Sequence, residues 1–201
     1  MNVLIACEFS GIVRDAFLVK GHNAWSCDLL PTEKEGPHYQ CDVRKILDGH
    51  WDLMIAHPPC TYLTNAGVRH LHDHVVSRTG KKTKVSGSER WVALFEAAKF
   101  FNLLKQANIP KIAVENPIPH KYSKDLIGGY DQLIQPWQFG HGETKAICLW
   151  LKNLPLLKPT NIVDGRLARV HREAPSPERW KNRSRFFTGI AKAMADQWGI
   201  L

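Results

Sequence analysis

Apolar and polar residues come in short blocks along the first third of the chain. Four apolar runs predict strands, at residues 2–9, 23–30, 38–43 and 51–57. Between the first two, residues 10–21 have a Ser/Gly turn, apolar positions at helical spacing and a stop at Gly21, which predicts a short helix. Strands that are nearly continuous in apolar residues and alternate with helices are typical of a parallel sheet.

The second half of the chain continues this alternation. After a polar stretch at 61–87, residues 88–108 have the helical period, and Ser88 is a suitable N-cap. The apolar face that we expect to be buried contains Val92, Phe95, Ala98, Phe101 and Leu104. The remaining predicted elements are two strands and a closing helix, at residues 111–117, 145–155 and 187–200.

These elements predict an α/β fold with a doubly wound, mostly parallel sheet covered by helices. With 201 residues and no linker between two cores, we expect residues 1–201 to form one domain. In such sheets ligands bind outside the carboxyl ends of the strands, so the residues at those ends are the ones to consider first.

The charge of the chain favours an anionic partner. The formal net charge is +8, and the pI is near 9.3, which is typical of proteins that bind nucleic acid. A solvated basic surface is the alternative. The basic residues cluster in three runs, at 78–84, 165–172 and 179–185.

The cysteines and the chain start bear on where the protein works. The cysteines at positions 7, 27, 41, 60 and 148 are odd in number and form no CxxC pair, so we expect reduced thiols. No apolar run is long enough to span a membrane. Residues 1–9 have no basic leader and are typical of a first strand, so a cytoplasmic protein is expected.

Chemically active side chains recur at the predicted strand ends. Acids follow four of the five strands up to residue 117, and a cysteine follows the remaining one: Glu8, Asp28, Asp42, Cys60 and Glu115. A single acid at a strand end is usually a helix cap or a turn former. The whole row favours a bound ligand.

Two of these acids suit an adenosyl group. A carboxylate after the second strand can accept hydrogen bonds from ribose hydroxyls, which fits Asp28. Asp42 can accept from an exocyclic amino group, and Gly11 would let the backbone approach the ligand. The turn lacks the GxGxxG pattern of a pyrophosphate site, which favours an adenosyl ligand without phosphates.

Cys60 follows the prolines that end the fourth strand. It could be a small core residue, a metal ligand or a nucleophile. The run HLHDH at 70–74 suggests zinc through His70, His72 and His74, but no second cysteine cluster has metal spacing, so we expect no metal.

These strand-end segments resemble the DNA cytosine-5 methyltransferases. EFSGIVRDAF (8–17), HPPCTYLTNAG (57–67) and VENP (114–117) are similar to the family's Phe-x-Gly, Pro-Pro-Cys and Glu-Asn motifs. GHGETKAICLWL (140–151) and TGIAKAMADQW (188–198) are weaker matches to its Gln-x-Arg-x-Arg segment and its last Gly-Asn helix. The matches run in the family's order over most of the chain.

The resemblance implies a Rossmann-like, S-adenosylmethionine-dependent methyltransferase that acts on cytosine in DNA. Cys60 would add to carbon 6 of a flipped base, Glu115 would assist at ring nitrogen 3, and Lys145 is the positive charge kept from the Gln-x-Arg-x-Arg segment. The implied cofactor-binding residues are Phe9, Ser10, Gly11, Asp28, Leu29, Asp42, Val43 and Pro58. The implied phosphate contacts are Lys81, Lys82 and Lys84, in a loop closing over the base, with Arg183 and Arg185.

The chain departs from the family pattern in four places. Val13 and Arg14 replace glycines of the first motif, and Gly189 is followed by Ile190 in place of asparagine. The Gln-x-Arg-x-Arg position contains residues 143–147, ETKAI, in which only Lys145 keeps a positive charge and Glu143 could be structural. Only the short basic segment 152–186 is available where the family inserts a target-recognition domain, so selectivity would be low or supplied by a partner. Amino-group transfer, another nucleic-acid or nucleotide substrate, and a catalytically silent binding protein remain as alternatives.

Overall fold

The computed structural model describes residues 1–72 and 87–201, and within them it forms one seven-stranded sheet in the order β3-β2-β1-β4-β5-β7-β6. The strands are β1 (Asn2–Ala6), β2 (Asn23–Asp28), β3 (His38–Gln40), β4 (Leu53–Ala56), β5 (Lys111–Asn116), β6 (Gln132–Ile134) and β7 (Ile147–Lys152). β3, β2, β1, β4 and β5 run parallel, and β7 is antiparallel to both of its neighbours. The predicted doubly wound, mostly parallel α/β fold is confirmed.

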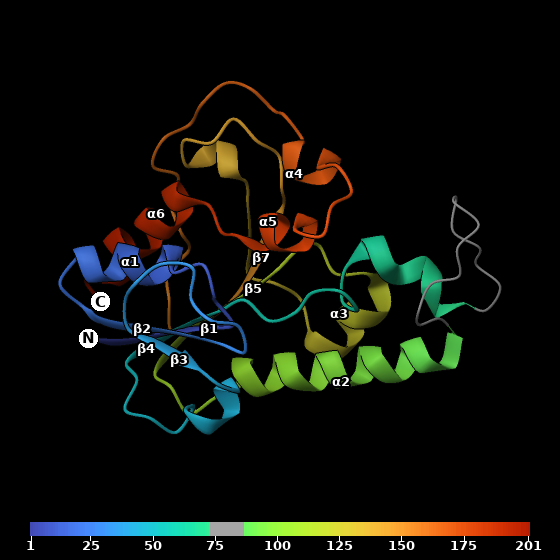
Figure 1. The fold of residues 1–201 in the computed structure, drawn as a ribbon, viewed down its shortest axis with the longest axis horizontal. Coiled ribbons are helices and arrows are strands. Elements are labelled where there is room, and N and C mark those ends of the chain that lie inside the picture. The colour runs from blue at the N-terminus through green and yellow to red at the C-terminus, as the bar shows by residue number, and fades with distance from the viewer. Residues whose placement is uncertain (73–86) are drawn as a thin grey trace.

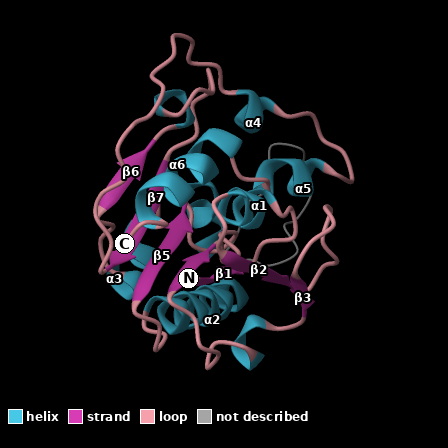
Figure 2. Ribbon diagram, turned by 90° about the vertical axis from the view of Figure 1, so that its left-hand side faces the viewer, coloured by secondary structure: helices cyan, strands magenta, loops and turns pink. Residues whose placement is uncertain are grey.

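Helices cover both faces of the sheet (Figures 1 and 2). α1 (Ile12–Val19) and α6 (Thr188–Trp198) lie on one face, and α2 (Gly87–Lys105) and α3 (Lys121–Ile127) lie on the other. Two short helices, α4 (Arg169–Arg172) and α5 (Arg179–Ser184), belong to the segment 152–186. The 3-10 helices are η1 (Val43–Lys45), η2 (Asn65–Leu71) and η3 (Pro136–Gln138).

Two apolar cores explain why the central strands are apolar throughout. Val3 and Ile5 of β1 pack with α1 and α6, whereas Leu4 and Ala6 pack against α2. Successive side chains of a strand point to opposite faces, so a sheet covered on both sides needs apolar residues at every position.

The buried face of α2 agrees with the prediction in part, because Ala98, Phe101 and Leu104 are buried against the sheet. Val92 and Phe95 are 63% and 53% exposed, and Leu94 is buried in their place. The error has a physical reason: apolar residues are spread around this helix, so periodicity alone could not say which side faces the sheet.

The far edge of the sheet contains elements that the hydrophobic pattern did not predict. β6 has three residues and α3 has seven, which is too short for a clear period. β7 is antiparallel, with Glu115 opposite Leu149, and its predicted start at 145 lies two residues before the observed one. Ser88 lies inside α2, which already includes Gly87.

The chain reverses its direction of strand addition between β1 and β4. From β1 it adds β2 and β3 on one side, and β4 then pairs with the other side of β1. This topological switch point is where open α/β sheets bind ligands, just beyond the carboxyl ends of the strands. The residues that follow β1 and β4 are therefore brought to one place.

Candidate active site

Glu8, the first acid of the strand-end row, is a helix cap. Its carboxylate is buried and accepts hydrogen bonds from the backbone N–H groups of Val13 (2.7 Å) and Arg14 (3.2 Å). The Ser10 hydroxyl also donates to it, at 3.1 Å. These bonds satisfy N–H groups that the first turn of α1 would otherwise leave unpaired. For this one acid, the ordinary structural interpretation holds.

The turn after β1 has a tighter structure than the family motif implies. Gly11 has a φ of +71°, and a Cβ there would lie 2.5 Å from the Arg14 guanidinium. Phe9 is buried and lies 6.2 Å from the ring of Trp180. Phe9, Ser10 and Gly11, which we predicted to touch the cofactor, do not line the cavity described below.

Arg14 stands where the family pattern has a glycine, and its side chain is fully buried. The guanidinium donates to Ser26 and Thr32 hydroxyls, to the carbonyls of Lys34 and Glu35, and to Asp15. It thereby ties the loop between β2 and β3 to α1. Gly36, with a φ of +147°, leaves room for it, since a Cβ there would lie 2.8 Å from the guanidinium.

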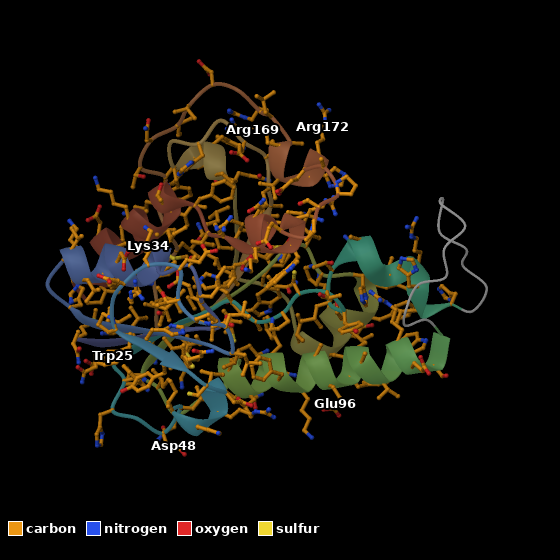
Figure 3. All side chains as sticks on the ribbon, in the orientation of Figure 1. Trp25, Lys34, Asp48, Glu96, Arg169 and Arg172 are labelled. Atoms are coloured by element: carbon orange, nitrogen blue, oxygen red, sulfur yellow. The ribbon has the colours of Figure 1, made fainter. Side chains whose placement is uncertain are left out.

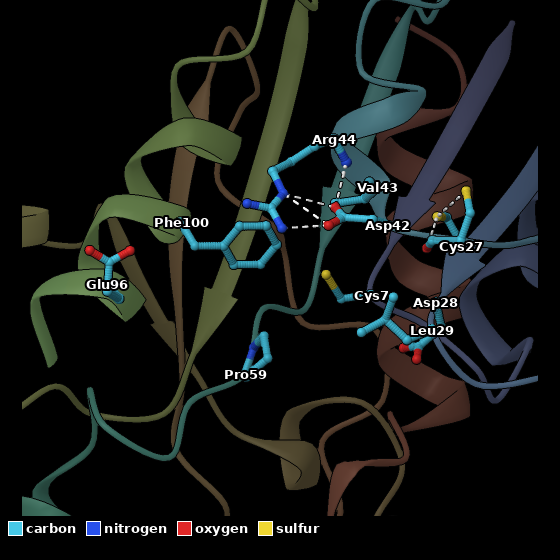
Figure 4. A pocket seen from close by; sticks show the side chains of 11 residues that line it. Cys7, Cys27, Asp28, Leu29, Asp42, Val43, Arg44, Pro59, Glu96 and Phe100 are labelled. Atoms are coloured by element: carbon cyan, nitrogen blue, oxygen red, sulfur yellow. Dashed lines mark hydrogen bonds and ion pairs between the residues drawn. The ribbon is translucent and has the colours of Figure 1, made fainter. Parts of the chain in front are cut away.

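A cavity of about 320 Å³ opens at the carboxyl ends of β1, β2 and β3 (Figure 4). Half of the predicted cofactor residues line it, namely Asp28, Leu29, Asp42 and Val43. The predicted Pro58 is buried, and its neighbour Pro59 lines the cavity instead. The sequence analysis missed the other lining residues: Cys7, Cys27, Cys41, Arg44, Glu96 and Phe100.

Two of these missed residues come from α2. Glu96 and Phe100 are one helical turn apart on that helix, and Figure 4 shows the Phe100 ring pointing toward Asp42 and Arg44, with Glu96 farther out at the rim. No local signal marks them, because they are more than 50 residues from Asp42 in the chain and meet it only when α2 packs on the sheet.

The charges around the cavity are mostly negative. Asp42 forms a two-pronged ion pair with Arg44, with contacts of 2.5 to 3.0 Å, and these hydrogen bonds lower the pKa of Asp42 to about 2. Burial raises the pKa of Asp28, whose carboxylate accepts a hydrogen bond from the Leu30 N–H at 2.9 Å. The lining thus contains three carboxyl groups, those of Asp28, Asp42 and Glu96, and one guanidinium, which disfavours phosphates.

A second group of side chains gathers beyond β4 and β5. Because these strands are neighbours, the turn containing Cys60 and the carboxylate of Glu115 lie on the same edge of the sheet. Lys145, just before β7, and Arg183 of α5 complete the group. The Lys145 ammonium donates to the Arg183 carbonyl at 3.0 Å and lies 5.7 Å from the ring of Phe187.

The pKa of the Cys60 thiol depends on burial and on the charges of these neighbours. Burial raises the pKa of Cys60, and the Glu115 carboxylate raises it further, while Lys145 and Arg183 act in the opposite direction. In the protein without ligands the thiol is therefore the favoured form. A nucleophile needs the thiolate, so removal of a negative charge at Glu115 would favour attack.

The turn after Cys60 is anchored on both sides. The backbone carbonyl of Cys60 accepts hydrogen bonds from the N–H groups of Leu63 (3.1 Å) and Thr64 (3.2 Å). Arg90 of α2 donates to the Thr61 carbonyl at 3.1 Å and lies over the Tyr62 ring. The first part of the predicted closing loop is thus held against α2, and residues 73–86 of that loop lie outside the described residues.

His57 lies beside Glu115. Its Nδ1 is 3.4 Å from Glu115 Oε2, and both side chains are mostly buried, at 11% and 13% exposure. The ring of Phe186 covers it, with ring centroids 4.7 Å apart. Its other nitrogen, Nε2, is buried and has no hydrogen-bond partner within residues 1–72 and 87–201.

The predicted phosphate-binding residues are spread more widely. Lys81, Lys82 and Lys84 lie outside the described residues. Arg185 forms a two-pronged ion pair with Glu33, at 2.7 and 2.8 Å. Arg172 projects outward from α4 (Figure 3), and its neighbour Arg169 pairs with Glu143 at 2.9 Å, which gives Glu143 a structural partner.

The predicted absence of a metal concerns residues that are only partly described. His70 is buried, and residues 73–74 of the HLHDH run lie outside the described ranges. Within those ranges no cluster of three His, Cys, Asp or Glu side chains could hold a metal ion. The described helices include none that is both long and apolar enough to cross a membrane.

Comparisons with known proteins add little to this geometry. No protein-family model and no curated protein matches the chain. Among solved structures, it is similar to a candidate DNA modification methyltransferase encoded within a prophage of E. coli, with a TM-score of 0.47 and 15% identity. The match covers 88% of this chain and 56% of that one, so this chain spans little more than half of its length. The function is therefore argued from the site.

Proposed function

We propose that this protein is an S-adenosylmethionine-dependent DNA methyltransferase that methylates carbon 5 of cytosine. The observation that carries the proposal is the pairing of β4 with β5, which brings Cys60 and Glu115 to one edge of the sheet, beside an acidic cavity. Pro59, next to Cys60 in the chain, lines that cavity.

The residues of the cavity fit an adenosyl group. Asp28 can accept hydrogen bonds from ribose hydroxyls, Asp42 from an exocyclic amino group, and the Phe100 ring and Val43 supply apolar walls. The surplus of carboxylates suits a cationic sulfonium better than a phosphate. When bound, this cofactor would supply an electrophilic methyl group. The Arg44 guanidinium already donates to both carboxylate oxygens of Asp42. A ligand amino group would therefore have to form its hydrogen bond to Asp42 beside those of Arg44.

The residues beyond β4 and β5 suit addition to a pyrimidine ring. The Cys60 sulfur would form a bond to carbon 6 while Glu115 donates a proton to ring nitrogen 3, so that the ring becomes an enamine with a nucleophilic carbon 5. Lys145 and Arg183 favour the thiolate. After methyl transfer, the proton on carbon 5 is lost to water, the sulfur leaves carbon 6 as the thiolate, and ring nitrogen 3 returns its proton to Glu115. A flipped cytosine would be needed, since carbon 6 is inaccessible within a duplex.

Label transfer tests the proposal. The protein is incubated with S-adenosylmethionine carrying a tritiated methyl group and with mixed-sequence DNA, beside Cys60→Ala and the control Cys148→Ala. Cys148 is buried in β7 and its loss leaves the proposed chemistry intact. We expect label in cytosine with the wild type and with the control but none with Cys60→Ala.

The same experiment separates the alternatives. DNA containing 5-fluorocytosine keeps a fluorine where a proton must leave, so a covalent adduct with Cys60 should persist on a denaturing gel. Label without the adduct would indicate transfer to an amino group. DNA binding without cofactor binding would support a catalytically silent binding protein, and label in RNA or free nucleotides alone would reassign the substrate.

A further inference from the structure

His57 is held firmly at the boundary between β4 and β5. Its backbone N–H donates to the Ala6 carbonyl at 2.9 Å, which extends the pairing of β4 with β1 by one residue. Pro58 and Pro59 follow it, and a proline restricts the backbone of the residue before it to extended conformations. The imidazole therefore projects from a rigid part of the edge.

The imidazole and the Glu115 carboxylate face one another. Nδ1 and Oε2 are 3.4 Å apart, which is longer than most N–H···O hydrogen bonds. Catalytic hydrogen bonds are often this long before the substrate binds and shorten in the complex. Within the described ranges, no other side chain forms a hydrogen bond or an ion pair with Glu115. Phe186 packs against the imidazole with ring centroids 4.7 Å apart, so the ring cannot turn freely away.

The surroundings of the two ring nitrogens select one tautomer. Nδ1 faces a carboxylate oxygen and is the position at which a proton finds an acceptor. Nε2 is buried without a partner among the described residues, and a proton there would be a buried donor left unpaired. Of the two tautomers of the neutral ring, the one protonated on Nδ1 is therefore favoured.

We propose that His57 is the positioning residue for Glu115. The Nδ1–H group donates to Oε2 and fixes the plane of the carboxyl group, so that the other oxygen faces ring nitrogen 3 of the target base. This inference rests on the proposed function. It assigns a role to the histidine that precedes Pro58, and small errors in the position of such a group are costly to catalysis.

Nuclear magnetic resonance tests the contact without any need for activity. Nitrogen-15 shifts of the histidine rings distinguish the two tautomers, and the His57 signals are identified by their loss in His57→Gln. We expect His57 to be protonated on Nδ1 in the wild type and to lose this preference in Glu115→Met, which has no oxygen acceptor for the Nδ1–H group. A His57 ring whose nitrogen shifts are the same in both proteins would overturn the proposal.

Two substitutions at position 57 test the functional role. The amide nitrogen of asparagine can replace Nδ1–H, whereas that of glutamine reaches nearer to the place of Nε2, so His57→Asn should keep the contact and His57→Gln should lose it. The measured step is release of tritium from carbon 5 of cytosine in DNA without cofactor, which reports addition of Cys60. We expect His57→Gln to lower this rate about tenfold to a hundredfold with the KM for DNA unchanged, and His57→Asn to recover most of it.

The two experiments separate the failure of one idea from the failure of the other. Equal rates for the wild type and both variants would overturn the positioning role while leaving the proposed function in place. If the wild type neither releases tritium nor transfers a methyl group to any nucleic acid, the proposed function is wrong. The tautomer of His57 then still decides whether the histidine holds Glu115.

Discussion

At the scale of single residues, buried charges define the turn between β1 and α1. Glu8 caps α1. Arg14, six residues later, binds the loop between β2 and β3, which forms one wall of the cavity. An arginine whose donors are all satisfied can be buried, but loss of the guanidinium leaves its acceptors unpaired. Arg14 thus stabilises the loop between β2 and β3, at a position where the resemblance implies a glycine.

Replacement of Arg14 should show this dependence. In Arg14→Met, the Asp15 carboxylate and the carbonyls of Lys34 and Glu35 lose the hydrogen bonds that the guanidinium donates. We expect the free energy of unfolding to fall by about 3 kcal/mol, measured by urea denaturation. The control Arg172→Met removes an exposed arginine of α4 and should leave the urea midpoint unchanged. Equal midpoints for both variants would contradict this account.

The thiol of Cys60 should respond to its charged neighbours. Its pKa lies above the ordinary value of 9.0, so alkylation by iodoacetamide should be slow at neutral pH and rise with pH. Glu115→Gln removes a negative charge, which lowers the pKa and speeds alkylation at pH 8. Lys145→Met removes a positive charge and should slow it.

The rates are followed by mass spectrometry of the peptide that contains Cys60, which separates it from the other four cysteines. Cys41 serves as an internal reference, because it is partly exposed and lies near neither variant position. Complete alkylation of Cys60 at pH 7, or an alkylation rate that neither substitution changes, would show that burial and these charged neighbours do not control the pKa of Cys60.

At the scale of elements, α2 does two things at once. Leu94, Phe101 and Leu104 pack against the sheet, while Glu96 and Phe100 form a wall of the cavity. Arg90, in its first turn, also anchors the segment after Cys60. The orientation of this helix therefore affects both the fold and the candidate site.

Paired alanine substitutions in α2 test that orientation. Leu94 is fully buried, so Leu94→Ala should lower the free energy of unfolding by about 3 kcal/mol. Val92 is 63% exposed, so Val92→Ala should change it by less than about 0.5 kcal/mol. Urea denaturation measures both, and the reverse order would show that α2 presents the face that periodicity suggested.

At the scale of the whole molecule, the excess of positive charge is the main guide to a partner. The net charge is +8, whereas the cavity contains a single basic side chain, Arg44, beside three carboxyl groups. The other basic groups lie outside the cavity and can contact phosphates while the cavity holds a neutral or cationic ligand. Part of this charge is engaged internally, as in the pair of Arg185 with Glu33.

The salt dependence of DNA binding tests where phosphates are contacted. If Lys81, Lys82 and Lys84 touch the backbone, replacing all three with alanine should flatten the slope of log K against log salt by up to about 2.7, at about 0.9 per contact. The control replaces Lys20, Lys111 and Lys158, which carry the same charge and contact Asp196, Leu201 and Gln197 at the C-terminal end of the chain. Fluorescence anisotropy with labelled duplex measures the slopes, and equal changes in the two variants would exclude a local contact.

Predictions from the sequence succeeded where a local pattern reflects a general physical need. Strands covered on both faces must be apolar throughout, so β1, β2, β4 and β5 were recognisable. The acids at the strand ends could also be identified, because the end of each apolar run marks the end of a strand. The role of Glu8 was not, since a capping acid and a ligand-binding acid look alike in sequence.

The sequence by itself determined that the sheet is mostly parallel, that the protein is basic and which residues stand at the strand ends. Hydrophobic period, composition and the turn residues that end strands are all local properties of the chain. Only the tertiary structure decided which of these residues meet. It joined α2 to the cavity, tied Arg14 to the loop after β2 and set His57 against Glu115, 58 residues apart in the chain. Such contacts depend on which strands become neighbours and how helices rotate against them, and hydrophobic period does not specify either.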